Sequence, residues 1–148
     1  MADVTTTKKI IERGGWAALG QKVGYMEVTV SLVSGSSAHD LVYLFGLEAD
    51  TLILAVGSEI ITAAANAVTA SVGTLTDHGT PGNATTLMGE TIDCDGAVGA
   101  QSCGGQGLAN VLLAADETIV LELSGDPGAG GSVRIWAVVA DIGQVSGL

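Results

Sequence analysis

Residue types of a serine hydrolase stand close together at Ser36, Ser37, His39 and Asp40. A serine triad needs three groups that converge from different segments, so immediate neighbours do not build one. The chain also lacks the G-x-S-x-G motif that holds a nucleophilic serine above a sheet. These residues therefore predict a turn before a strand, and the sequence predicts no catalytic residue and no enzyme.

Acidic side chains gather in the second half of the chain and raise the question of calcium. The run Asp93-Cys94-Asp95-Gly96 resembles the opening of a calcium loop, but the later ligands and the closing glutamate are missing at the required spacing. Asp77, Glu90, Asp93 and Asp95 could still converge in space on a hard cation. The alternative is a solvated acidic loop, and we predict no metal or cofactor from these residues.

The soft metal ligands of the chain are His39, His78, Cys94 and Cys103. None stands at the C-x₂-C or H-x₃-H spacing of a zinc site, so structural zinc is not expected. The first residues are polar where a signal peptide would be apolar, which indicates synthesis in a reducing cytosol. Both cysteines are then free thiols by default, and a disulfide across their small loop is the alternative if the protein meets an oxidising medium.

The glycine-rich stretch Gly125–Gly131 is expected to be a turn rather than a phosphate loop, because it lacks the Gly-Lys-Ser/Thr ending. Apolar, β-branched runs flank it within Glu117–Ile142, which predicts a β-hairpin. In the expected register Leu123 faces Val133 on an apolar face. The other face places Glu122 opposite Arg134 as a structural ion pair.

The composition describes a chain that is poor in charge. It has 148 residues, which suits one domain, and only 14% of them are charged against about 25% in a typical soluble domain. No apolar run approaches the roughly 18–20 residues of a membrane span, so no membrane partner is expected. A surface with so little charge indicates burial against other chains. We therefore expect a homo-oligomer, with a trimer as the first model.

Charge is also unevenly distributed, which suggests an N-terminal arm, residues 1–22, followed by a sandwich domain, residues 23–148. The arm has a net charge of +2 and the body a net charge of −13. A body this acidic repels phosphate, so nucleic acid is not an expected partner. The arm carries the residues that we expect to bind a partner: Lys8, Lys9, Arg13, Trp16 and Leu19.

The rest of the chain consists of short alternating or apolar runs separated by turns. Strands are expected at Tyr25–Val33, Leu41–Leu47, Thr51–Val56 with a continuation over Glu59–Ala65, Ala67–Leu75, within Thr85–Ile92, at Leu108–Leu113 and in the closing hairpin. No segment shows a helical period over ten residues. The fold class is therefore all-β, an antiparallel β-sandwich with jelly-roll-like connections and an extended N-terminal arm, an immunoglobulin-like sandwich being the alternative.

Parts of this pattern resemble small virion proteins of tailed bacteriophages. The stretch DTLILAVGSEIITAAANAVTASVGTLTDHG (residues 50–79), the segment NATTLM (83–88) and the late strand ETIVL (117–121) carry the resemblance, which spans roughly residues 25–142. It is a resemblance to capsid decoration (cement) proteins and to sandwich modules of tail or fibre proteins. It implies a structural role, usually in a symmetric oligomer.

The resemblance implies a decoration protein that binds the outside of the major capsid shell and stabilises it. The expected partner is then the major capsid protein, and the expected location is the capsid surface of the virion after synthesis in the host cytoplasm. A tail, collar or fibre component is the alternative within the virion. A carbohydrate-binding sandwich is a third hypothesis, against which stands the scatter of the aromatic residues along the sequence.

Overall fold

The computed structural model describes residues 3–7, 22–78, 87–88, 91–104 and 111–142. Its elements are β1 (Asp3–Thr7), β2 (Lys22–Leu32), β3 (Leu41–Leu47), β4 (Thr51–Thr62), β5 (Thr69–Thr74), α2 (Leu75–His78), β6 (Ile92–Asp93), β7 (Gln101–Gly104), β8 (Val111–Leu112), β9 (Glu117–Leu123) and β10 (Gly131–Asp141). Within these ranges no helix is long and apolar enough to cross a membrane.

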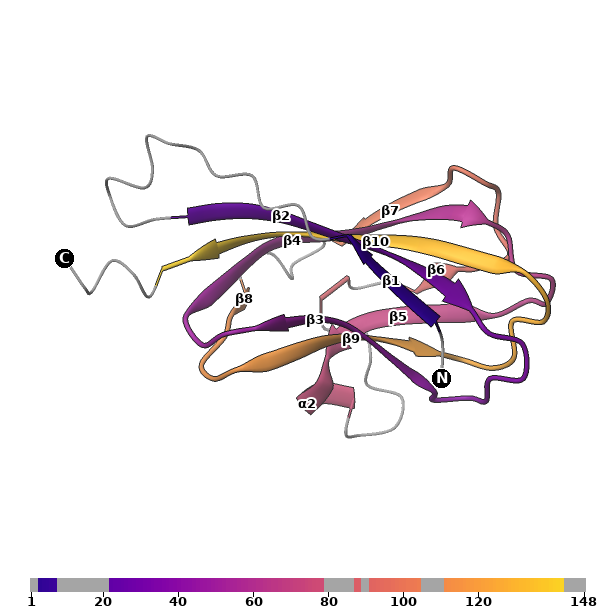
Figure 1. Cartoon of the computed structure of the whole chain (residues 1–148), viewed down its shortest axis with the longest axis horizontal. Helices are drawn as coiled ribbons and strands as arrows, with labels where there is room; N and C mark the ends of the chain where they lie inside the picture. The colour runs from indigo at the N-terminus through magenta and orange to yellow at the C-terminus, as the bar shows by residue number, and fades with distance from the viewer. Residues whose placement is uncertain (1–2, 8–21, 79–86, 89–90, 105–110, 143–148) are drawn as a thin grey trace.

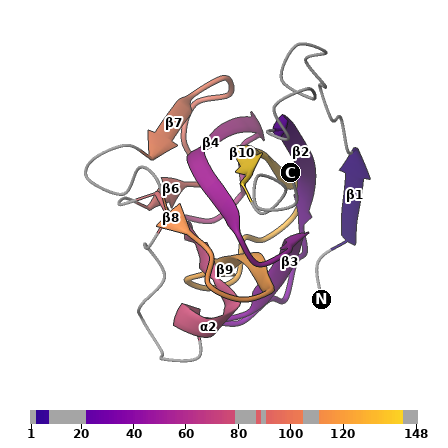
Figure 2. The same cartoon turned by 90° about the vertical axis from the view of Figure 1, so that its left-hand side faces the viewer.

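Two antiparallel sheets pack face to face, which confirms the predicted sandwich (Figure 1). The first sheet has the strand order β1-β2-β10-β4-β7, and β8 also pairs with β4. The second sheet has the order β3-β9-β5-β6. Seen from the end, β1 lies at the edge of the first sheet beside β2 (Figure 2). Jelly-roll connections and an extended arm stay predictions.

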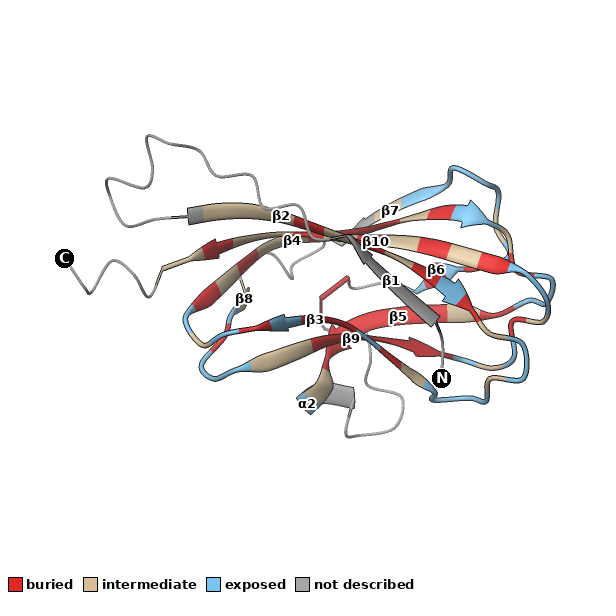
Figure 3. Ribbon diagram, viewed as in Figure 1, coloured by how far each residue is buried: buried red, intermediate tan, exposed pale blue. Residues whose placement is uncertain are grey.

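The core lies between the sheets and follows from the alternation of side chains along each strand. On β2 the inward positions Met26, Val28, Val30 and Leu32 are buried, and the positions between them are more exposed. On β10 the inward residues Val133, Ile135 and Ala137 repeat this pattern from the same sheet. The buried positions therefore line the inner faces of the strands, whereas the loop tips are exposed (Figure 3).

The predicted hairpin between β9 and β10 is wrong. β9 lies in the second sheet between β3 and β5, and β10 lies in the first sheet between β2 and β4. The connection of seven residues between them is an arch from one sheet to the other, and Asp126 and two positive-φ glycines, Gly128 and Gly130, shape it. Each of these strands has a hydrogen-bonded partner on both sides, so neither has a free edge with which to pair the other.

Other strands also differ from the sequence expectation. β1 lies within the predicted arm and pairs with β2, from Asp3 opposite Ser31 to Thr7 opposite Glu27. β7 lies in a stretch whose glycines and polar residues predicted a loop, and it pairs with β4. β4 runs through Gly57 as one strand of 12 residues, where the sequence predicted two runs separated at Gly57-Ser58. In these three places, hydrogen bonding to a neighbouring strand determines the structure more strongly than the local composition does.

Candidate functional site

The outer face of the first sheet brings together side chains that are far apart in the sequence. On β10, Arg134 lies between Thr29 of β2 and Glu59 of β4. Two residues on, Trp136 lies between Glu27 of β2 and Gly57 of β4. We call Tyr25, Glu27, Glu59, Arg134 and Trp136 the outer patch. The three strands that hold them are hydrogen-bonded neighbours, so this patch sits on a rigid support.

Trp136 lies against the backbone of its neighbour, because the residue opposite it on β4 is Gly57. A Cβ atom at position 57 would overlap the indole ring. Glycine inside a strand often marks such a close approach, and an aromatic ring across the pair covers the bare backbone. The glycine therefore fixes the indole close to the sheet, with its ring half-buried.

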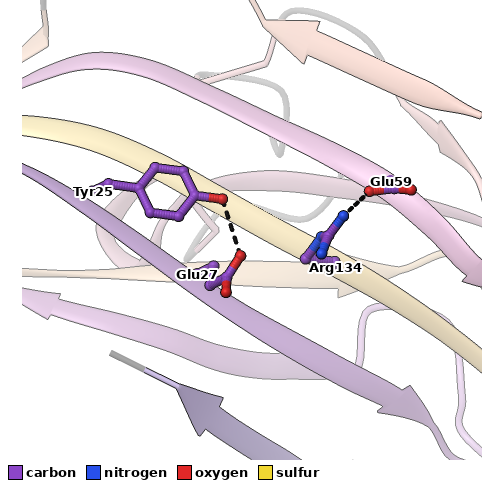
Figure 4. Close-up of polar contacts among 4 residues, drawn as sticks. All are labelled: Tyr25, Glu27, Glu59 and Arg134. Carbon is purple, nitrogen blue, oxygen red and sulfur yellow. Dashed lines mark hydrogen bonds and ion pairs between the residues drawn. The ribbon is translucent and has the colours of Figure 1, made fainter. Parts of the chain in front are cut away.

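Tyr25 extends the aromatic surface beside Trp136. The two ring centroids are 6.4 Å apart and the ring planes differ by 23°, an offset stacked arrangement. The Tyr25 hydroxyl donates a hydrogen bond of 3.0 Å to Oε2 of Glu27, as Figure 4 shows. Desolvation, and then this hydrogen bond to Glu27, raise the pKa of Tyr25 above its ordinary value. The phenol therefore stays neutral and holds the carboxylate in place.

Arg134 completes the patch through an ion pair with Glu59, and the predicted pair Glu122–Arg134 is wrong. The guanidinium contacts Oε2 of Glu59 across the β10–β4 pair (Figure 4). Glu122 lies in the other sheet, where Nδ1 of His39 contacts its Oε1 at 2.6 Å. The physical reason is the arch between β9 and β10, which places the two strands in different layers.

The remaining predicted residues belong to the predicted arm, to the turn before β3 and to the loop around Cys94. Lys8, Lys9, Arg13, Trp16 and Leu19 lie outside the described residues. The segment around His39 is a turn before β3, as expected: Ser37 donates its backbone N–H to Asp40, and the Ser36 hydroxyl donates to the carbonyl of Val33. On the other side of the turn, Nδ1 of the His39 ring contacts Oε1 of Glu122 on β9 at 2.6 Å.

Cys94 is a free, fully buried thiol on the core side of its loop. Burial, with the nearby charges of Asp93 and Asp95, raises its pKa to about 12. Of the four acidic residues considered for calcium, Asp93 and Asp95 share a hydrogen bond that raises the pKa of Asp93. Glu90 lies outside the described residues. Among the residues that the structure does describe, no three His, Cys, Asp or Glu side chains lie close enough to hold a metal ion.

A hollow with a volume of 470 Å³ lies where β3 ends and β9 begins, and its acidic side chains hydrogen-bond to the segments that line it. Asp116 accepts a hydrogen bond from the backbone N–H of Ala49. Glu117 accepts two from Thr76, one from the backbone and one from the hydroxyl. Asp116 thus joins two loops and Glu117 joins β9 to α2, so both carboxylates have structural partners and we take the outer patch as the candidate site.

Sequence reasoning missed the outer patch although its signal was present. The alternation of Tyr25, Glu27 and Thr29 on one strand matches that of Val138, Trp136 and Arg134 on another. Pairing β10 with β9 instead of β2 kept these two sets apart. The second signal was Gly57, a glycine in the middle of a strand that begins with the apolar run Leu52–Val56.

No protein-family model matches the sequence, and neither does any curated protein sequence. The fold is similar to chains in three solved phage capsid structures. A chain of the capsid of Ralstonia phage GP4 has a TM-score of 0.59 at 15% identity, with 90% of this chain and 89% of that chain covered. A chain of the Cyanophage Pam1 capsid asymmetric unit has a TM-score of 0.56 at 16% identity, with 82% and 86% covered.

The third structure is the acidic stable capsid of Helicobacter pylori bacteriophage KHP30. One of its chains has a TM-score of 0.56 at 10% identity, and the match covers 94% of this chain and 92% of that chain. At such identities the likeness is one of fold. Since the match takes in nearly the whole of each neighbour, those chains are small proteins of about this size rather than long subunits that contain the sandwich as one part.

Proposed function

We propose that this protein is a virion structural protein of a bacteriophage, and specifically a decoration protein that binds the outside of the major capsid shell. The observation that carries the proposal is the near end-to-end match of the sandwich to small chains in three phage capsid structures. The low charge content supports it independently, because a surface with few charges favours extensive contact with other proteins.

The mechanism is mechanical rather than chemical. The sandwich sits across a joint between shell subunits, so the joint opens only when contacts on several chains break together. The N-terminal residues 1–22, which carry four of the five basic side chains, add contacts to a neighbour. A homo-oligomer, with a trimer as the first model, multiplies these contacts on the symmetric shell.

A tail, collar or fibre component is the alternative, and the capsid neighbours favour the head. The test compares purified shells with and without the protein. We expect the protein to raise the temperature at which shells burst and to add density on their outer surface. An unchanged bursting temperature together with a bare shell would exclude the decoration role. Light scattering at micromolar concentration tests the oligomer, and a clean monomer would contradict it.

A further inference from the structure

We propose that the outer patch is the surface that docks on the capsid shell, with Trp136 and Tyr25 as its anchors. This inference rests on the proposed function and deepens it, because it names the residues and the face that make the contact. It concerns the sandwich itself, whereas the sequence alone directs attention to the N-terminal arm.

The first argument is that the outer patch gathers residue types that are rare in this chain. The whole chain has two tryptophans, two tyrosines and one phenylalanine, and Arg134 is the only basic residue after Lys22. One tryptophan, one tyrosine and this arginine converge on the outer patch. Trp, Tyr and Arg are the residue types that contribute most binding energy in protein interfaces. A chain so poor in them has placed three on one face that its own core does not use.

The second argument is the anatomy of the face. Beyond the rings, Val138 pairs with Ala55 of β4 and continues the apolar surface, and both are half-buried. In the other direction Arg134 and Glu59 form the charged side, next to Thr29. An apolar centre beside a charged rim is the organisation of a protein interface. Because Gly57 fixes the indole, little side-chain entropy is lost on docking.

The third argument concerns charge and indicates which kind of protein binds the outer patch. The two glutamates and one arginine of the outer patch sum to −1, and residues 23–148 carry −13 in total. If a second copy docked through the same face, two surfaces of like net charge would meet, which disfavours self-association through the outer patch. The complementary surface is a shell protein that offers an apolar hollow for the rings and basic side chains opposite Glu27 and Glu59.

The test titrates the full-length protein onto purified shells stripped of it, and measures the bound fraction by sedimentation. Trp136→Ala and Tyr25→Ala are compared with Tyr43→Ala, a matched control on the other sheet whose tyrosine is 51% exposed. We expect the concentration for half-saturation to rise at least about tenfold for both patch variants and less than about twofold for the control. Circular dichroism verifies that each variant is folded. If Trp136→Ala does not fold, the binding of Tyr25→Ala alone tests the inference.

Three results overturn the inference and differ from one another. In the first, the wild-type protein binds shells and the folded patch variants reach half-saturation at the same concentration. This result excludes the outer patch as the docking surface but leaves the decoration role intact. A loss of self-association in the patch variants without a loss of shell binding makes this face a contact between copies. Failure of the wild-type protein to bind stripped shells removes the proposed function, and this inference falls with it.

Discussion

Gly57 is the residue on which the outer patch depends, because the Trp136 indole occupies the space of its missing side chain. Gly57→Ala forces the ring away from the sheet, so we expect the free energy of unfolding to fall by about 1–3 kcal/mol. Urea denaturation measures this loss. Gly46 of β3 is the matched control, since a Cβ there meets nothing within 4 Å. Equal effects of Gly57→Ala and Gly46→Ala would contradict the close approach of the ring.

Cys94 gives a second test at the scale of one residue. Its thiol is fully buried and its pKa is raised to about 12, so almost no reactive thiolate exists near neutral pH. In a Cys103→Ser background, we expect no reaction with a thiol reagent at pH 8 while the protein is folded. Complete reaction in denaturant is the control. Rapid labelling of the folded protein would show that Cys94 is not in the core.

At the scale of the elements, Asp126 joins two loops at one end of the sandwich. Its Oδ1 accepts hydrogen bonds from the backbone N–H groups of Gly128 at 2.8 Å and Gly35 at 2.9 Å. These bonds, that from Gly128 first, lower the pKa of Asp126 below its ordinary value. A carboxylate with a lowered folded pKa stabilises the protein above its unfolded pKa, and this contribution is lost as the pH falls through the folded value.

Asp126→Ala is therefore expected to lower Tm at pH 7. The difference from wild type should narrow as the pH falls below the unfolded pKa of about 4 and then through the lower folded pKa. Thermal unfolding followed by circular dichroism at both pH values measures it. Glu48→Ala, which removes the same charge from an exposed turn, should leave Tm nearly unchanged at pH 7. A difference between Asp126→Ala and wild type that stays constant down to pH 2 would contradict this account.

The edge strand β1 defines a further prediction. Deletion of residues 1–20 removes β1 and its pairing with β2 but leaves the core residues from Met26 onward. We expect the truncated protein to fold with a lower Tm and to attach more weakly to shells. Tm should fall by about 2–4 °C for each kcal/mol of unfolding free energy that is lost. Trp16→Ala should reproduce much of the lost attachment, since its aromatic side chain is the expected anchor of the arm. Truncated protein that binds shells as tightly as the full chain would show that residues 1–20 are not an anchor.

The elements also show how far the sequence could predict this fold. The alternation from Met26 to Leu32 defined β2, and Leu41–Leu47 was predicted with the bounds that the structure has. Strand partners could not be predicted, because the buried residues Ile119 to Leu123 alternate between the two faces of β9 and suit several neighbours. The candidate site depends on those partners. Once β10 was paired with β9, Arg134 was assigned to Glu122 instead of Glu59, and Trp136 was never placed over Gly57.

At the scale of the whole molecule, the two faces of the first sheet have different tasks. The inner face packs against the second sheet to form the core (Figure 3). The outer face places the Trp136 and Tyr25 rings and the Arg134–Glu59 pair on a rigid surface that the core does not require. The inner face accounts for the sandwich fold, which chains of three solved phage capsid structures share. The outer face carries the docking role that we propose.

The most direct test of the central claim is a cryo-electron-microscopy reconstruction of purified phage particles that contain the protein. The account predicts sandwich-shaped density on the outside of the head, across joints between shell subunits, with β2, β10 and β4 toward the shell. Density for the sandwich in the tail, collar or fibre, with an undecorated head, would contradict it.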